Sequence, residues 1–387
     1  MDIGYSKEDK EFRQRARAWL HDNVPTDARP AGHAAAAFDA DWQRRQFEGG
    51  WAGVNWPEEH GGLGLSRLQQ MIWYEESDRA NAPGFGAMLI ALTHAGPTLI
   101  AKGTEEQKSF HLRRILSGES VWCQGFSEPG AGSDLAALRT RAVVDGDDLV
   151  VSGSKIWTSW AGIANFQELL VRTDPTAKRH KGLTWVVCDM RSPGIDVQPI
   201  KSMPGEGVLN TVFYDDVRIP LSNVVGGIDN GWSVALSTLA FERGTTFLRD
   251  LVGLYAKVER VIHLASQQRT SDGSASISDI DRRLARVKTE AIALRSLAAS
   301  VVSGREDGGA SPKGSVVKIL ATGLNTEVNN LVMDILGPRA LEYSGLHSSN
   351  AWTYDYLWGK ALTIAGGTTE IQREIIADRV LGLPRAR

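Results

Sequence analysis

Hydrophobic residues follow a helical spacing at both ends of the chain and a strand-like spacing in the middle. In the first segment apolar residues recur every three or four positions, as on one face of an amphipathic helix. Two of these runs begin with the spacing of a helix-capping box, Ser6 with Asp9 and Thr104 with Gln107. We therefore expect residues 1–118 to form an N-terminal helical domain.

Between residues 119 and 226 the helical spacing gives way to short β-type runs separated by glycine, proline and aspartate. The clearest signal is a hairpin, in which the apolar runs 142–144 and 149–151 flank the turn residues 145–148. Further strands are expected at 183–187 and 211–214. This pattern predicts a central antiparallel β-barrel or sandwich.

The last segment, residues 227–387, returns to long runs rich in alanine, leucine, valine and arginine. Residues 280–303 and 315–336 have the length and composition of bundle helices, and 273–278 is the expected break before them. The predicted fold class is therefore α+β and mostly α. Its order is an N-terminal helical domain, a β-domain and a C-terminal four-helix bundle.

The composition narrows the class of protein. A chain of 387 residues with 42% hydrophobic residues can bury a core larger than that of one small domain. A formal net charge of −3 gives no support for binding nucleic acid or an anionic membrane. The only cysteines, Cys123 and Cys188, make no disulfide framework, and the acidic N-terminus resembles no targeting signal. We expect a cytoplasmic protein with no membrane span and no metal site.

The segment with the clearest chemistry is the glycine-rich stretch 124–134, which follows a strand-like run. Gly130 and Gly132 permit close approach of a ligand to the backbone, and exposed N–H groups there suit an anionic or carbonyl-rich ligand. The stretch matches neither the dinucleotide G-x-G-x-x-G pattern nor the G-x-S-x-G nucleophile elbow. Its glycine content alone is equally compatible with a plain surface turn.

Four segments together decide between these readings. Residues 126–134, Phe-Ser-Glu-Pro-Gly-Ala-Gly-Ser-Asp, resemble the first signature of the acyl-CoA dehydrogenase family. Residues 153–159 resemble its next flavin-contacting strand, 212–220 the stretch that closes its β-domain, and 367–373 its C-terminal signature. The loop from Trp56 to Gly64 also fits. The resemblance spans nearly the whole chain, in the family's order.

The resemblance implies an FAD-dependent enzyme that desaturates an acyl thioester between its α and β carbons and passes electrons to an electron-transferring flavoprotein. It implies that Phe126 and Ser127 bond the isoalloxazine edge, that Trp157 packs on the flavin face away from substrate, and that Ser159 bonds near flavin N5. The other implied cofactor contacts are Gly132, Ser133, Arg269, Gly337, Thr368 and Glu370. The alternatives are a buried core aromatic for Trp157 and a solvent-facing hydroxyl for Ser159.

The catalytic carboxylate departs from the usual family position. Many members carry a glutamate directly before the Gly-Thr of the C-terminal signature, and this chain has Gly366 there. A minority carry the base on the first helix after the β-domain, before an arginine, and Glu242 with Arg243 matches that pattern. We expect Glu242 to remove the α-proton while the Gly366 N–H holds the thioester carbonyl. The alternative for Glu242 is an ion pair with Arg243 or Lys257.

Other departures affect the substrate and the oligomer. By the resemblance, Ser133, Arg243 and Ala365 contact substrate, and the small Ala365 and Gly366 leave room for a bulky or branched acyl group. Ala240 replaces an aspartate that touches pantetheine in relatives. Residues 268–273 keep Arg269 but lack the phenylalanine of an Arg-x-x-Phe-Gly pattern that reaches a neighbouring subunit's FAD. Asp334 stands where a glutamine is usual. A homodimer, a homotetramer and a hetero-oligomer with a homologue all remain open.

Three alternatives to a conventional dehydrogenase follow from these departures. The chain could be a catalytically weak subunit that pairs with an active homologue, as the degraded 268–273 region suggests. It could also carry oxidase or monooxygenase chemistry on the same fold. A DNA-binding branch would require a basic surface, which the charge of −3 does not favour. The sequence does not choose between coenzyme A and a carrier protein as the thioester's second half.

Overall fold

The computed structural model describes residues 5–205, 207–241, 247–272, 279–303, 313–343 and 351–384. Their contacts divide the chain into two compact units. Unit 1 comprises residues 1–24, 65–82 and 243–387, and unit 2 comprises residues 25–64 and 83–242. The first helical segment of the sequence is therefore shared between the units, and the helix after the β-domain belongs to unit 2.

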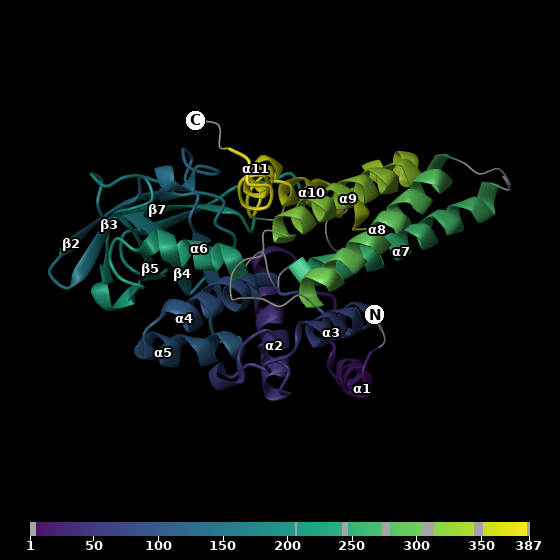
Figure 1. The fold of residues 1–387 in the computed structure, drawn as a ribbon, viewed down its shortest axis with the longest axis horizontal. Helices are drawn as coiled ribbons and strands as arrows, with labels where there is room; N and C mark the ends of the chain where they lie inside the picture. Colours follow the sequence, from purple (N-terminus) through teal and green to yellow (C-terminus); the bar gives the residue numbers. More distant parts are fainter. Residues whose placement is uncertain are drawn as a thin grey trace. The chain divides into compact units, whose positions relative to one another are not determined.

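Unit 2 is built around one sheet with helices packed against it (Figure 1). Its α- and π-helices are α2 (Ala35–Glu48), η4 (Ala91–Ala95), α4 (Gly96–Lys102), α5 (Glu105–Leu116) and α6 (Gly231–Phe241). Its strands are β1 (Trp122–Gly125), β2 (Arg141–Asp145), β3 (Asp148–Lys155), β4 (Phe166–Arg172), β5 (Leu183–Asp189), β6 (Ile195–Pro199), β7 (Asn210–Pro220) and β8 (Val224–Val225).

The sheet runs in the order β6-β7-β3-β2-β4-β5-β8, and β1 pairs with β4. Most neighbours are antiparallel, as the turn pattern predicted, but β1 pairs with β4 in parallel and β2 meets β4 in parallel at one position. Parallel neighbours require a long connection. The β2–β3 hairpin supplies it between β1 and β4.

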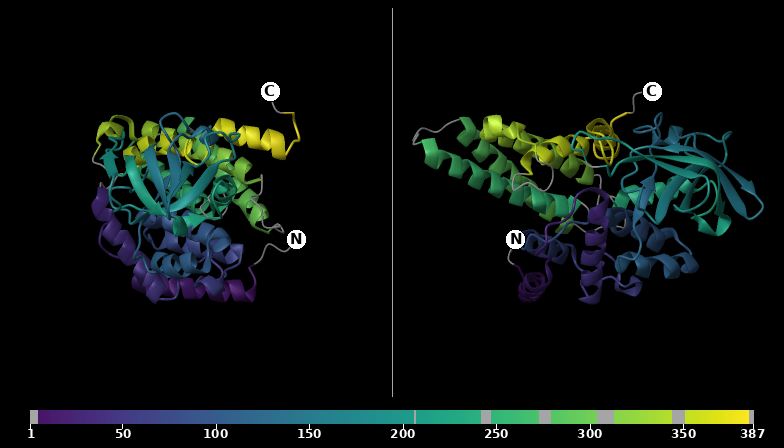
Figure 2. Two further views of the ribbon diagram at one scale, coloured as in Figure 1. Left: turned by 90° about the vertical axis from the view of Figure 1, so that its left-hand side faces the viewer. Right: turned by 180° about the vertical axis from the view of Figure 1, so that it is seen from behind.

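Unit 1 consists of helices, of which α7, α8 and α9 are long and pack side by side (Figures 1 and 2). Its α-helices are α1 (Lys7–Asn23), α3 (Arg67–Arg79), α7 (Phe247–Asp272), α8 (Asp279–Ser303), α9 (Lys313–Leu336), α10 (Trp352–Leu362) and α11 (Thr369–Arg379). The predicted break at 273–278 lies outside the described residues.

The local signals of the sequence are confirmed where the structure describes them. The Ser6 and Thr104 side chains both accept the N–H of the third helical residue, and both capping boxes are complete. The β2–β3 hairpin has Asp145 opposite Asp148, with Gly146 at a φ of +62°. That backbone angle lies in the region that favours glycine.

Each unit has its own hydrophobic core. In unit 2 the fully buried Trp56, Trp122 and Trp185 belong to a cluster that joins the sheet to the helices. The Trp56 ring passes so close to Gly96 that a Cβ there would lie 2.0 Å from it, which requires glycine at that crossing. In unit 1 the core is a stripe of valine and leucine along α7, α8 and α9, including Val258, Val287 and Val328.

Two classes of feature are not found among the described residues. No described helix is both long and apolar enough to cross a membrane. Within the same ranges, no three or more histidine, cysteine, aspartate or glutamate side chains are grouped so that they could hold a metal ion.

Candidate active site

The glycine-rich segment forms a projecting loop directly after β1. Glu128 and Ala131 exchange two backbone hydrogen bonds, each 3.0 Å long, so that Pro129 and Gly130 form an exposed tip. A Cβ added at Gly130 or Gly132 would meet no atom within 4 Å. The loop therefore leaves open space beside its backbone, which is the space a ligand needs.

A buried ion pair fixes the base of this loop. The Lys155 ammonium, at the end of β3, is fully buried and lies 2.8 Å from Glu128 Oε1. It also donates to the Phe126 carbonyl at 3.0 Å. The Glu128 carboxylate accepts the N–H groups of Arg139 at 2.7 Å and Thr140 at 2.8 Å. One charged pair thus joins the loop to the end of β3 and the segment leading into β2.

The protonation of this pair reflects two opposing effects. Burial lowers the pKa of Lys155 to about 8, although the Glu128 carboxylate favours the ammonium form. Burial also opposes ionisation of Glu128, but the Lys155 charge and the hydrogen bonds from Thr140 and Arg139 outweigh it and lower the pKa of Glu128. Both groups are therefore charged at neutral pH.

The segment 153–159, which resembles the family's flavin-contacting strand, lies beside the glycine-rich loop. Ile156 donates its N–H to the Ser127 carbonyl at 2.9 Å. The next residue, Trp157, has a φ of +62° and a side chain that is 56% exposed. Bulky residues rarely adopt that backbone angle, and it holds here because Thr158 is bonded in both directions to Asn210, at 2.9 and 3.1 Å.

This arrangement excludes the reading of Trp157 as a core aromatic. The next two residues differ in their burial. Thr158 is fully buried, and its hydroxyl has no hydrogen-bond partner among the described residues. Ser159 is partly exposed beside Trp157. Phe126, Ser127, Trp157 and Ser159 are thus gathered at one end of the sheet, while Gly132 and Ser133 are exposed further along the loop.

The C-terminal signature forms a second loop, in unit 1, between α10 and α11. Gly366 and Gly367 have φ values of +65° and +93°. The buried Lys318 side chain of α9 donates to the Ala365 and Gly367 carbonyls. The buried Gln372 side chain of α11 donates to the Gly366 carbonyl at 3.0 Å and the Gly367 carbonyl at 3.3 Å.

The start of α11 completes this loop. The Thr368 hydroxyl caps the helix by accepting the Ile371 N–H at 3.3 Å. A hydrogen bond from its own N–H, and a second from Thr368, hold the pKa of Glu370 below its ordinary value. A helix start with free N–H groups favours anionic ligands. The start of α11 at Thr368 therefore has the chemistry that the cofactor contact implied by the resemblance requires.

The remaining predicted residues fall in three places. Gly337 ends α9 with a φ of +54°, an angle that favours glycine after a helix. Arg269 lies within α7. Glu242 and Arg243 lie outside the described residues. Lys257, the alternative partner considered for Glu242, is paired with Asp355 at 2.8 Å.

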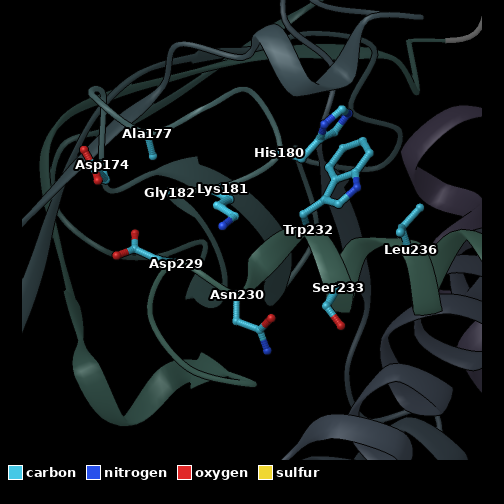
Figure 3. Close-up of a pocket in the computed structure, with 10 residues that line it drawn as sticks. All are labelled: Asp174, Ala177, His180, Lys181, Gly182, Asp229, Asn230, Trp232, Ser233 and Leu236. Atoms are coloured by element: carbon cyan, nitrogen blue, oxygen red, sulfur yellow. The ribbon is translucent and has the colours of Figure 1, made fainter.

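A pocket of about 730 Å³ opens in unit 2 between the β4–β5 loop and the start of α6 (Figure 3). Figure 3 shows the His180 and Trp232 rings on one side, Asp174 and Asp229 on the other, and Lys181 between them. The two ring centres are 4.7 Å apart. Sequence reasoning missed this pocket, because its walls come from two segments with no shared motif.

The residues present fit a flavin dinucleotide. An exposed tryptophan offers a flat apolar face, and the adjoining loop has open space beside its glycines. In unit 1 the N–H groups of Gly367 and Thr368 donate to no other described residue. These are the groups that a planar ring system and a diphosphate require.

Family models match three consecutive parts of the chain. They are described as the acyl-CoA dehydrogenase N-terminal domain at residues 6–119, middle domain at 123–217 and C-terminal domain at 229–381. The chain belongs to the acyl-CoA dehydrogenase family. It is therefore a flavoprotein oxidoreductase of lipid metabolism, and FAD is its cofactor.

Curated relatives and solved structures agree over the full length. Acyl-CoA dehydrogenase IpdE1 of Mycobacterium tuberculosis is 38% identical, over 97% of this chain and 98% of that protein. FadE26 of the same organism is 34% identical over the whole of both chains. The ChsE4-ChsE5 complex of M. tuberculosis matches with a TM-score of 0.85 and 32% identity, covering all of both chains. The Tcur3481-Tcur3483 steroid ACAD matches with a TM-score of 0.83 and 32% identity, also covering all of both chains.

Proposed function

We propose that the protein desaturates a bulky acyl-CoA thioester, with Glu242 as the base that removes the α-proton. Bound FAD supplies the acceptor for the hydride that leaves the β-carbon. The protein's own tasks are then to aim the acyl chain, to hold the thioester carbonyl and to take one proton. The departure of proton and hydride leaves a trans-type α,β double bond conjugated with the thioester.

One observation carries the flavin part of this proposal. The glycine-rich loop after β1, which contains Ser127, and the turn after β3, which contains Trp157, are joined by the hydrogen bond from the Ile156 N–H to the Ser127 carbonyl. This bond sets a hydroxyl, open backbone groups and an exposed indole beside each other. In the proposed complex Phe126 and Ser127 bond the flavin edge, Trp157 covers the flavin face away from substrate, and Ser159 bonds near N5.

The choice of base rests on what Gly366 lacks. Glycine there has no side chain, and its φ of +65° disfavours most other residues. The N–H remains, so Gly366 keeps the role of carbonyl donor while proton transfer passes to Glu242. Arg243 follows Glu242 directly and is proposed to contact substrate with Ser133 and Ala365. Thr368, Glu370, Arg269 and Gly337 are proposed for the rest of FAD.

The acyl group is proposed to be bulky, and a fused-ring group of steroid type is the leading candidate. The small Ala365 and Gly366 support it, because neither residue would place a large side chain over a thioester bound to the Gly366 N–H. The relative named as a steroid ACAD supports the ring system, at 32% identity over the whole of both chains. A hydrophobic pocket discriminates by about 10–200-fold per methylene, so a fused-ring substrate should stand out clearly in kinetics.

Coenzyme A is preferred to a carrier protein because of the pocket in Figure 3. Its His180 and Trp232 rings suit a nucleobase, and the Lys181 ammonium suits a phosphate. The Asp229 carboxylate opposite them already accepts the Thr173 hydroxyl. A carrier protein has no nucleotide to fill such a pocket.

A homologous partner chain and an electron-transferring flavoprotein complete the proposal. Support for the partner chain comes from the solved ChsE4-ChsE5 complex, whose matching chain this protein covers fully. The electron acceptor and the cytoplasmic location remain predictions from the sequence. The alternative of a catalytically weak subunit has less support, because the segments 126–134 and 153–159, which resemble the family's flavin-contacting motifs, are intact.

The test is an anaerobic assay of the purified chain, alone and co-expressed with a homologue. We expect a yellow protein with one FAD per chain whose absorbance bleaches with a fused-ring acyl-CoA. Straight medium-chain acyl-CoA and the matching acyl-carrier protein should bleach it more slowly. A colourless protein that FAD does not reconstitute alone or with its partner would refute the flavin assignment. Bleaching only when a homologue supplies the FAD would favour the weak-subunit reading.

A further inference from the structure

We propose that Lys318 is a positioning residue for the dehydrogenation. Its buried ammonium group binds the carbonyl of the Ala365–Gly366 peptide and thereby aims and polarises the Gly366 N–H. This inference rests on the proposed function, in which that N–H holds the thioester carbonyl. It adds a charged side chain on α9 to the groups on which the reaction depends.

The direction of the N–H follows from peptide geometry. A trans peptide is planar, and its C=O and N–H point to opposite sides. No peptide bond between the described residues is cis. Because Lys318 holds the Ala365 carbonyl, the N–H of Gly366 must point away from Lys318. The same reasoning applies to the next peptide, whose carbonyl on Gly366 is held by Gln372 at 3.0 Å.

All three carbonyls from Ala365 to Gly367 are therefore drawn toward two buried donors, Lys318 and Gln372. The N–H groups of Gly366, Gly367 and Thr368 donate to no other described residue. Successive backbone N–H groups in such a turn form a concavity that attracts negative charge. The positive φ values of Gly366 and Gly367 are what allow the turn.

Charge gives Lys318 an effect that geometry alone would not. An ammonium donor makes a hydrogen bond roughly twice as strong as a neutral donor does. The bond draws electron density from the carbonyl oxygen and through the peptide from its N–H, which becomes a better donor. As the α-proton leaves, negative charge develops on the thioester oxygen, and the stronger donor stabilises that charge more than it stabilises the ground state.

This role is separate from stability. Lys318 lies on the same buried stripe of α9 as Val317 and Ala321, where an apolar residue would pack without a partner to satisfy. A lysine there must use its ammonium group, and the structure shows that it uses it on the loop. A purely structural clamp could be made by neutral donors such as Gln372.

The first experiment compares Lys318→Met with Lys288→Met, using the full chain with FAD bound. Lys288 is a matched control, because its partly buried ammonium lies on α8 and bonds the Tyr255 hydroxyl at 2.9 Å instead of the loop. We expect Lys318→Met to slow flavin reduction about 10–10²-fold, less than the roughly 10²–10³-fold that follows loss of an oxyanion donor itself. KM and FAD content should change little, and Lys288→Met should reduce its flavin at the wild-type rate.

The second experiment reads the carbonyl directly. The probe is the 1-¹³C enoyl-CoA product of whichever acyl-CoA reduces the wild-type flavin fastest. Its bound carbonyl stretch, measured by isotope-edited infrared spectroscopy, should lie below the value in water. Lys318→Met should move it back toward that value, and Lys318→Arg, which keeps the charge, should move it less. An unchanged stretch and rate in folded Lys318→Met, or equal effects of Met and Arg, would overturn the proposal.

A fallback covers the case in which Lys318→Met loses its FAD or fails to fold. Gln372→Met removes the neutral donor from the same loop and leaves Lys318 in place. We expect it to shift the carbonyl stretch in the same direction but by a smaller amount, and no shift would count against the clamp. A wild-type protein that no acyl-CoA reduces would instead refute the proposed function.

Discussion

The sharpest stability prediction concerns the Lys155–Glu128 pair that anchors the flavin loop. Lys155→Met keeps the length of the side chain and removes the ammonium. Glu128 is then left with a side chain that is only 9% exposed and two backbone N–H donors, from Arg139 and Thr140. Removing one partner of a buried pair costs about 3–5 kcal/mol, and the two surviving hydrogen bonds place the expected cost at about 3 kcal/mol.

The same free energy should appear in FAD affinity, because the flavin needs the loop in its folded position. About 3 kcal/mol corresponds to roughly 10²-fold weaker binding, at about 1.4 kcal/mol for each factor of ten. The assay is a double-mutant cycle in the FAD dissociation constant, with Lys155→Met, Glu128→Leu and the two combined. The combined variant leaves no buried charge, so it should bind FAD better than the product of the two single effects predicts. Strictly multiplicative effects, or single variants with wild-type affinity, would refute the reasoning.

Three further predictions test other parts of the account. Burial lowers the pKa of Lys155 from 10.5 to about 8, so between these two pH values the unfolded state binds a proton that the folded state lacks; the free energy of unfolding, measured in urea, should therefore rise with pH across this range in the wild type relative to Lys155→Met, and a fall would contradict the reasoning. Gly366→Glu added to Glu242→Gln should restore only part of the activity, because a φ of +65° costs a non-glycine residue about 1 kcal/mol or more; full recovery would show that the angle is not a constraint. Trp232→Ala should raise KM for the acyl-CoA but not for the same acyl group on pantetheine alone, and equal changes for both would remove the nucleotide from the pocket.

The sequence predicted the elements whose causes are local. Capping boxes at Ser6 and Thr104, the β2–β3 hairpin and the long helices α8 and α9 each depend on residues that are neighbours in the chain. Periodicity does not say which apolar faces meet, so it did not reveal that α1 packs on α3 and that α3 packs on α7 and α8 in unit 1. For the same reason the parallel pairing of β1 with β4 was not predicted.

The same difference between local features and contacts of distant segments applies to the candidate site. The resemblance named the loop residues such as Ser127 and Trp157, because these are recognisable from short motifs. It did not reveal the two buried lysines, Lys155 and Lys318, that hold those loops in place. A lysine in an apolar stripe is a signal that some partner exists, but the partner is identified only when the chain is folded. Glu128 is found in this way as the partner of Lys155, and the Ala365 and Gly367 carbonyls as the partners of Lys318.

The measurement that tests the central claim most directly is the rate of anaerobic flavin reduction in Glu242→Gln. The variant keeps the shape of the side chain and removes its basicity, so FAD and the acyl-CoA should bind as in the wild type. General-base catalysis contributes typically about 10²–10⁴-fold, and we predict that bleaching by the best acyl-CoA slows by at least about 10²-fold. Bleaching at the wild-type rate would contradict the account, because another group would then be removing the α-proton.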